Sequence, residues 1–98
     1  MRYEDQIIIE KCSVQEEKVL ENILAELQKA QSKFHSFHSM HEGYAVLKEE
    51  IEELWEMIKV DNYEEAEKEA IQVAAMAIRF IIDCKKNPLG LRKNDTGI

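Results

Sequence analysis

Basic residues and cysteines are scarce in this chain of 98 residues, and neither a long apolar run nor the pattern of a signal peptide is visible in it. Thirteen Lys and Arg stand against twenty Asp and Glu, so the formal net charge is −7 at pH 7. This balance argues against nucleic-acid binding, which needs a basic surface. The two cysteines, Cys12 and Cys84, are far apart and form no Cys-x-x-Cys pair, as expected of reduced thiols in the cytosol.

The patterns of a signal peptide and of a membrane span bear on the expected location of the protein, and its length bears on the number of domains. No basic region followed by an apolar one opens the chain, and the longest apolar run, at 73–82, is short and interrupted by Arg79. We therefore expect a cytoplasmic protein that does not cross a membrane. Its length predicts a single domain over residues 1–98, with an N-terminal arm at 1–12 and a C-terminal tail at 87–98. The arm contains Ile7-Ile8-Ile9, which fits either a short strand or an extended arm.

Three amphipathic or apolar helices account for the rest of the chain, which predicts an all-α fold. The first begins after Ser13, because Ser13 and Glu16 have the spacing of a capping box, and its apolar repeat reaches at least Ser32. Phe34 and Phe37 are expected to extend its apolar side. The looser, serine-containing segment that follows carries three histidines at steps of three residues, His35, His38 and His41. A zinc site there is one interpretation, and a histidine that contacts a phosphate or carboxylate is the other.

The second helix is predicted from about Glu42 to Lys59. Its apolar residues form a core-facing stripe at helical spacing: Leu47, Ile51, Leu54, Trp55 and Ile58. Three carboxylates gather on one flank of the same helix, those of Glu49, Glu50 and Glu53. Like charges at this spacing repel, and a hard divalent cation would convert the repulsion into attraction because it takes carboxylate oxygens. A solvated acidic face is the alternative interpretation.

A turn at 60–62 leads to the third helix, with Asn62 as its N-cap and Lys85 and Lys86 in its last turn. From residue 70 to 82 this helix is apolar on nearly every side, so we expect it to be buried all round. Three short helices do not surround a central one, and the prediction is therefore a homo-oligomer. The polar exceptions share one stripe: Glu69, Gln72, Arg79 and Asp83. Arg79 and Asp83 have the spacing of a mutual ion pair, whereas Glu69 and Gln72 can face the carboxylates of the second helix.

The acidic pattern as a whole resembles a known family. Glu49-Glu50-x-x-Glu53, followed after fifteen residues by Glu69-x-x-Gln72, is similar to the paired acidic motifs of the MazG-like, all-α nucleoside triphosphate pyrophosphohydrolases. The segments HEGYAVLKEEIEELW and EAIQVAAMAIRFIID resemble a small single-domain branch of that superfamily, over roughly residues 34–83. One position departs from the family pattern, because Gln72 stands where the family has Asp.

The resemblance implies a homodimer or homotetramer in which three helices per chain assemble into four-helix-bundle-like packing. It also implies Mg²⁺-dependent hydrolysis, with Mn²⁺ as an alternative ion, of a ribo- or deoxyribonucleoside triphosphate to the monophosphate and pyrophosphate. The implied metal ligands are Glu50, Glu53, Glu69 and Gln72, and the implied catalytic residues are Glu49, Glu50 and Glu53. The implied contacts to the substrate come from Lys48, Arg79 and His41.

Because Gln72 removes one charge from this set, a carboxylate at position 72 is expected to tighten Mg²⁺ binding. A non-catalytic helical oligomer that keeps the fold and binds a nucleotide, or serves as an interaction module, is the competing interpretation.

Overall fold

The computed structural model describes residues 13–86, and over this range the chain is all helical, with three helices and no strand. The helices are α2 (Val14–Lys33), α3 (Met40–Lys59) and α4 (Tyr63–Lys86). The predicted all-α fold is therefore confirmed for this range. The predicted arm at 1–12, with its isoleucine run and Cys12, and the tail at 87–98 lie outside the described residues.

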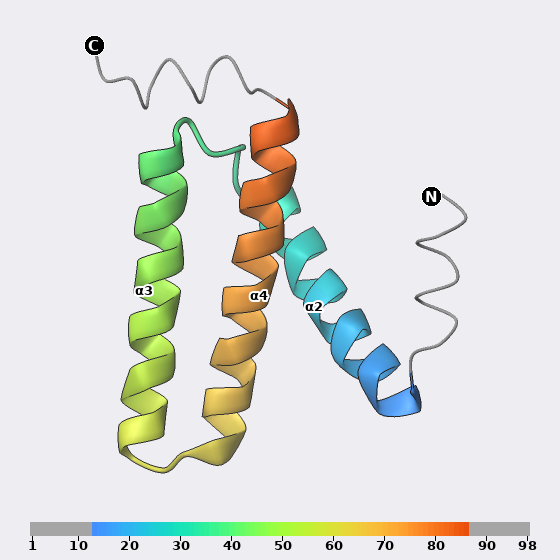
Figure 1. Ribbon diagram of the computed structural model, residues 1–98, viewed down its shortest axis with the longest axis vertical. Coiled ribbons are helices and arrows are strands. Elements are labelled where there is room, and N and C mark those ends of the chain that lie inside the picture. Colours follow the sequence, from blue (N-terminus) through green and yellow to red (C-terminus); the bar gives the residue numbers. More distant parts are fainter. Residues whose placement is uncertain (1–12, 87–98) are drawn as a thin grey trace.

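Helix α4 is the central element of the fold. Helices α3 and α4 form an antiparallel hairpin, and α2 leans against α4 and diverges from it toward its own N-terminus (Figure 1). The small core lies where α2 and α4 approach each other. Its buried members are Leu27 and Ala30 of α2 with Ala75 and Met76 of α4, and Val46 and Leu47 of α3 pack against them.

Each helix begins where a short polar side chain satisfies a free backbone amide. The capping box is present at α2, where the Ser13 hydroxyl accepts a hydrogen bond of 3.2 Å from the Glu16 amide. Ser39 caps α3 in the same way, so this helix begins at Met40, two residues before the predicted start. Asn62 Oδ1 accepts from the Glu65 amide at 3.2 Å, as the sequence predicted.

The segment between α2 and α3 differs from the prediction in one respect. Helix α2 ends at Lys33, and Phe34 and Phe37 lie in the connection instead of extending the apolar side of the helix. The Phe37 ring is buried, and the Phe37 amide donates a hydrogen bond of 2.9 Å to Asp83 Oδ2 of α4. The connection is therefore held on the central helix by a hydrogen bond between the Phe37 amide and Asp83, which the helical period of the sequence does not predict.

A glycine lets α3 approach α4 closely. Gly43 is buried in the first turns of α3, and a Cβ atom at this position would overlap the ring of Phe80 on α4. The absence of a side chain at this point permits the contact that holds the hairpin together near the connection.

The predicted burial of the apolar faces is only partly achieved within a single chain. Leu47 and Leu54 of the α3 stripe are half-buried, whereas Ile51, Trp55 and Ile58 are exposed. The third helix is likewise not buried all round, since Ile81 keeps 54% of its surface exposed. Among the helices of residues 13–86, α4 packs against α2 and α3, and its exposed Ile81 shows that part of its surface remains uncovered. Within residues 13–86 no helix is long and apolar enough to cross a membrane.

Candidate metal centre

Three carboxylates from two helices meet on one side of the α3–α4 hairpin. One oxygen from each of Glu50, Glu53 and Glu69 lies within 4.8 Å of the other two. Glu50 and Glu53 are one helical turn apart on α3, and the antiparallel packing of α4 brings Glu69 opposite to them. The three residues, called the carboxylate cluster below, include each acidic side chain that was predicted as a metal ligand.

The cluster holds protons more tightly than isolated carboxylates do. Burial, followed by the neighbouring charges of Glu53 and Glu69, raises the pKa of Glu50 from 4.5 to about 7. Burial also raises the pKa of Glu69, and its contact with Glu53 adds to the rise. Both effects disfavour the charged form, the first because water is removed and the second because like charges approach. Near neutral pH the site without metal therefore carries fewer negative charges than its three carboxylates can bear.

The donor set fits a hard divalent cation. Glu69 Oε2 is buried and has no hydrogen-bond partner among the described residues. A buried acceptor without a donor is costly, and a cation would satisfy it. Carboxylate oxygens from three side chains are the ligand type of Mg²⁺, and the cluster is open on its Glu53 side, where substrate oxygens and water would complete the coordination.

A cavity of about 400 Å³ adjoins the cluster, because Glu50 is one of its walls. Its other walls come from all three helices and the connection: Ala30, Phe34, His35, Phe37, Glu42, Val46, Gln72, Met76 and Arg79. The wall is thus mostly apolar and aromatic, with a few polar groups, which is the usual composition of a small-molecule site.

Arg79 is the cation of this cavity wall, and its guanidinium is held in place from several sides. Its Nη2 donates to the backbone oxygen of His35 at 2.6 Å, and its Cζ lies 4.0 Å from the centroid of the Phe37 ring. Its Nε lies 3.9 Å from Asp83 Oδ2, so the predicted ion pair is present, and both side chains are buried. Arg79 therefore fastens the connection to α4 and lines the cavity at the same time.

The remaining predicted residues lie farther from the cluster or on exposed positions. Glu49 is exposed and adds only a minor share to the raised pKa of Glu50. Lys48 is exposed, with its Nζ 4.0 Å from Glu52 Oε1. His41 lines a separate apolar hollow of about 280 Å³ with Met40, Tyr44 and Phe80. Of the three residues predicted to contact substrate, only Arg79 lines the cavity beside Glu50.

Gln72 has a partner that the sequence did not reveal. Its Nε2 donates a hydrogen bond of 2.6 Å to Glu26 Oε2, which belongs to α2 and is 46 residues away. Glu26 also contacts Lys29 through its other oxygen, at 3.4 Å. In the sequence Glu26 is one of many acidic residues on an amphipathic helix, and only the crossing of α2 over α4 distinguishes it.

The histidine segment does not form a metal site with other ligands in the described structure. The rings of His35 and His38 stack with their centroids 4.4 Å apart, and His35 Nδ1 lies 2.8 Å from the Ser36 backbone oxygen. Within residues 13–86 the side chains that gather as metal ligands are the three carboxylates. Of these histidines, His35 lines the cavity beside Glu50, whereas His41 lines the separate apolar hollow.

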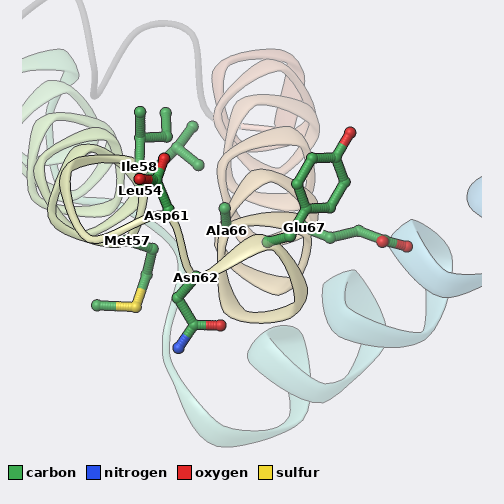
Figure 2. Close-up of a pocket in the computed structure, with 8 residues that line it drawn as sticks. Leu54, Met57, Ile58, Asp61, Asn62, Ala66 and Glu67 are labelled. Carbon is green, nitrogen blue, oxygen red and sulfur yellow. The ribbon is translucent and has the colours of Figure 1, made fainter.

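A larger hollow, of about 550 Å³, lies at the turn of the hairpin and contains no member of the cluster. Leu54, Ile58 and Ala66 give it an apolar wall, and the carboxylate of Glu67 extends away from Leu54 and Ile58 (Figure 2). Asp61 at its rim has a positive φ of 55°, which Asp tolerates better than most residues. Among the residues that the structure describes, its lining provides no group of ligands for a cation and lacks the buried charges of the Glu50 cavity.

Comparison of the chain with models of protein families, with curated proteins and with solved structures finds no match in any of the three.

Proposed function

We propose that the protein is a Mg²⁺-dependent pyrophosphohydrolase of nucleoside triphosphates that works as a homodimer or homotetramer. The observation that carries this proposal is the carboxylate cluster with its buried, unpartnered Glu69 oxygen beside a mostly apolar cavity. The resemblance of the acidic motifs to the MazG-like family supports the same reaction. Mn²⁺ is the alternative ion, since it accepts the same oxygen ligands.

In this proposal the acidic residues have two tasks, to hold the cation and to accept the proton of water. Glu50, Glu53 and Glu69 would hold the cation, with the carbonyl oxygen of Gln72 as a neutral ligand. Mg²⁺ held there would supply the positive charge that an acidic protein needs to bind phosphate oxygens, and it would lower the pKa of water. Glu49, exposed beside the cluster, accepts the proton of the attacking water. The water oxygen joins phosphorus at the anhydride between the α- and β-phosphates, and the bridging oxygen leaves with the other phosphate, which yields nucleoside monophosphate and pyrophosphate.

The cavity beside Glu50 is the proposed place for the part of the nucleotide that does not react. Phe34 and Phe37 offer aromatic surface there, and Arg79 and His35 stand in its wall. An apolar, aromatic wall suits a base, while the cluster at the edge of the cavity holds the phosphates.

The test is pyrophosphate release from a panel of nucleoside triphosphates in Mg²⁺, measured for the wild type and for Glu50→Gln. The wild type is expected to release pyrophosphate, and Glu50→Gln to abolish release from every triphosphate, because it removes a ligand shared by the cluster and the cavity. Glu52→Gln is the matched control, since Glu52 is an exposed acid of the same helix that contacts Lys48. If no triphosphate is hydrolysed by the wild type, the enzymatic proposal is wrong.

A second candidate is a non-catalytic helical oligomer that keeps the fold and binds a nucleotide. The positions of the cations favour it, because Lys48 is engaged with Glu52 and the Arg79 guanidinium is held by His35 and Asp83. Calorimetric titration with Mg²⁺ and nucleoside triphosphates separates the two. The second candidate predicts binding with no release of pyrophosphate.

A further inference from the structure

We propose that Glu26 of α2 is a positioning residue of the metal centre, which holds the Gln72 amide so that its carbonyl oxygen is available to the cation. This inference rests on the proposed function, because it concerns a ligand of the same Mg²⁺ site. It gives α2 a part in a site that was predicted from the other two helices alone.

The chemistry of the contact fixes the direction of the amide. Gln72 Nε2 lies 2.6 Å from Glu26 Oε2. An ionised carboxylate only accepts hydrogen bonds and an amide nitrogen only donates them, so the pair forms in one sense. The nitrogen end of the Gln72 amide is therefore held at Glu26, and the amide oxygen takes no part in this contact. A neutral amide at the same place in α2 would allow both senses.

Gln72 shares hollows with Glu26 and with two members of the carboxylate cluster. It lines the cavity that contains Glu50, and it also lines a hollow of about 470 Å³ between α2 and α4 that contains Glu26 and Glu69. It follows Glu69 by one helical turn on α4. Gln72 thus borders both the cavity that contains Glu50 and the hollow that contains Glu69, and an amide oxygen is an accepted ligand of hard cations.

Glu26 is itself held, as a positioning group must be. Its Oε1 contacts Lys29 Nζ at 3.4 Å, which leaves Oε2 for Gln72. Its side chain is three-quarters buried, with 26% of its surface exposed. Loss of a residue that orients a metal ligand commonly lowers metal affinity by about 10- to 100-fold.

The contact changes what is expected of substitutions at position 72. From the sequence, a carboxylate there should tighten Mg²⁺ binding. In the structure, Gln72→Glu on its own brings two carboxylates together at hydrogen-bond distance. The carboxylate is therefore expected to be accommodated only when Glu26 is changed as well. The double variant Glu26→Gln/Gln72→Glu restores a hydrogen bond of a single sense, in which the amide introduced on α2 is the donor and the carboxylate introduced on α4 is the acceptor.

The experiment is Mg²⁺ titration calorimetry on the full chain, with melting temperature in the absence of metal as a separate measure of folding. Glu26→Met, which removes the acceptor, is expected to raise the Kd for Mg²⁺ by about 10- to 100-fold. Glu26→Gln keeps the volume and is expected to raise it less, because the two amides then pair in either sense. The double variant is expected to bind Mg²⁺ at least as tightly as the wild type. Glu21→Gln, which removes an exposed carboxylate from the same helix, is the control and should match the wild type.

The outcomes separate this inference from the proposed function. If the wild type binds Mg²⁺ and both Glu26→Met and Glu26→Gln bind it equally well, the positioning of Gln72 by Glu26 is overturned while the metal centre stands. A double variant that binds no better than Glu26→Gln overturns it as well. If Glu26→Met does not fold, the comparison of Glu26→Gln with the double variant decides the question alone. A wild type that binds no Mg²⁺ overturns both proposals.

Discussion

At the scale of single residues, the carboxylate cluster destabilises the folded state of the metal-free protein. Glu50 and Glu69 are brought together with Glu53 by the packing of α3 on α4, and their pKa values rise because of burial and mutual repulsion. Such a cluster is tolerated in a fold when the charges are neutralised by protons or by a cation.

The first prediction concerns pH. A carboxyl group whose pKa is higher in the folded than in the unfolded state binds more protons when folded, so its contribution is present at low pH and lost as pH rises. For Glu50 the loss falls between about pH 4.5 and about pH 7. We expect the melting temperature of the metal-free protein to decrease across this interval and Glu50→Gln to flatten the decrease. Thermal unfolding at a series of pH values measures both, and a melting temperature that rises over the interval would contradict the raised pKa.

The second prediction concerns Glu53, the exposed member of the cluster. Because Glu53 faces two carboxylates, Glu53→Gln relieves repulsion and should leave the melting temperature of the metal-free protein unchanged or raised. The increase in melting temperature on adding Mg²⁺ should become smaller, since one ligand is lost. A large destabilisation without metal would show instead that Glu53 is a structural partner of another residue. The cations Lys48 and Arg79 pair with Glu52 and Asp83.

At the scale of elements, the connection between α2 and α3 is held by two buried side chains of α4. Arg79 donates to the His35 backbone oxygen, and Asp83 accepts from the Phe37 amide. These two bonds fix residues that have no helix or strand of their own. They also fix the wall of the Glu50 cavity.

The third prediction follows from this arrangement. Removing one member of a buried pair leaves the other charge uncompensated, so Asp83→Ala or Arg79→Ala should lower the free energy of unfolding by about 3–5 kcal/mol. Lys48→Ala, which breaks an exposed pair, should change it by less than about 1 kcal/mol. Urea denaturation measures each value. If Asp83→Ala behaves like Lys48→Ala, the buried pair does not anchor the connection.

At the scale of the whole molecule, the chain leaves apolar faces uncovered. Ile51, Trp55 and Ile58 of α3 are each about half exposed, at 51%, 55% and 47%, although they occupy one stripe. Exposed apolar residues in a continuous stripe are typical of a surface that meets another protein. A second copy of this chain is the partner that the proposed homo-oligomer requires.

The fourth prediction is that the protein is at least a dimer at micromolar concentration and that charges on the α3 stripe dissociate it. The variant Ile51→Glu/Trp55→Glu should reduce the mass measured by light scattering, because a charge is not easily buried without a partner. Glu52→Lys, which changes charge on the exposed acidic side of α3, should leave the assembly unchanged. A stable, well-folded monomer of the wild type would contradict the prediction.

The local signals in the sequence were sufficient for the helices and for part of the site. Helix starts depend on side chains within three residues of the affected amide, so Ser13 and Asn62 were identified correctly. Helical period likewise placed Glu50 and Glu53 on one flank and paired Arg79 with Asp83. The end of α2 was less predictable, because Phe34 and Phe37 continue the apolar period beyond the helix.

The tertiary structure alone decided which residues of different helices meet, because the helical period of a sequence does not predict contacts between helices. The sequence by itself determined three helices, the caps of α2 and α4 and the acidic flank, because these arise from neighbours within one or two turns. The crossing of α2 over α4 decided that Glu26 meets Gln72, and the packing of the connection decided that His35, and not His41, lines the cavity. Contacts between residues 46 positions apart are fixed by the packing of side-chain volumes, and a chain of many similar glutamates carries no local mark of which one will be used.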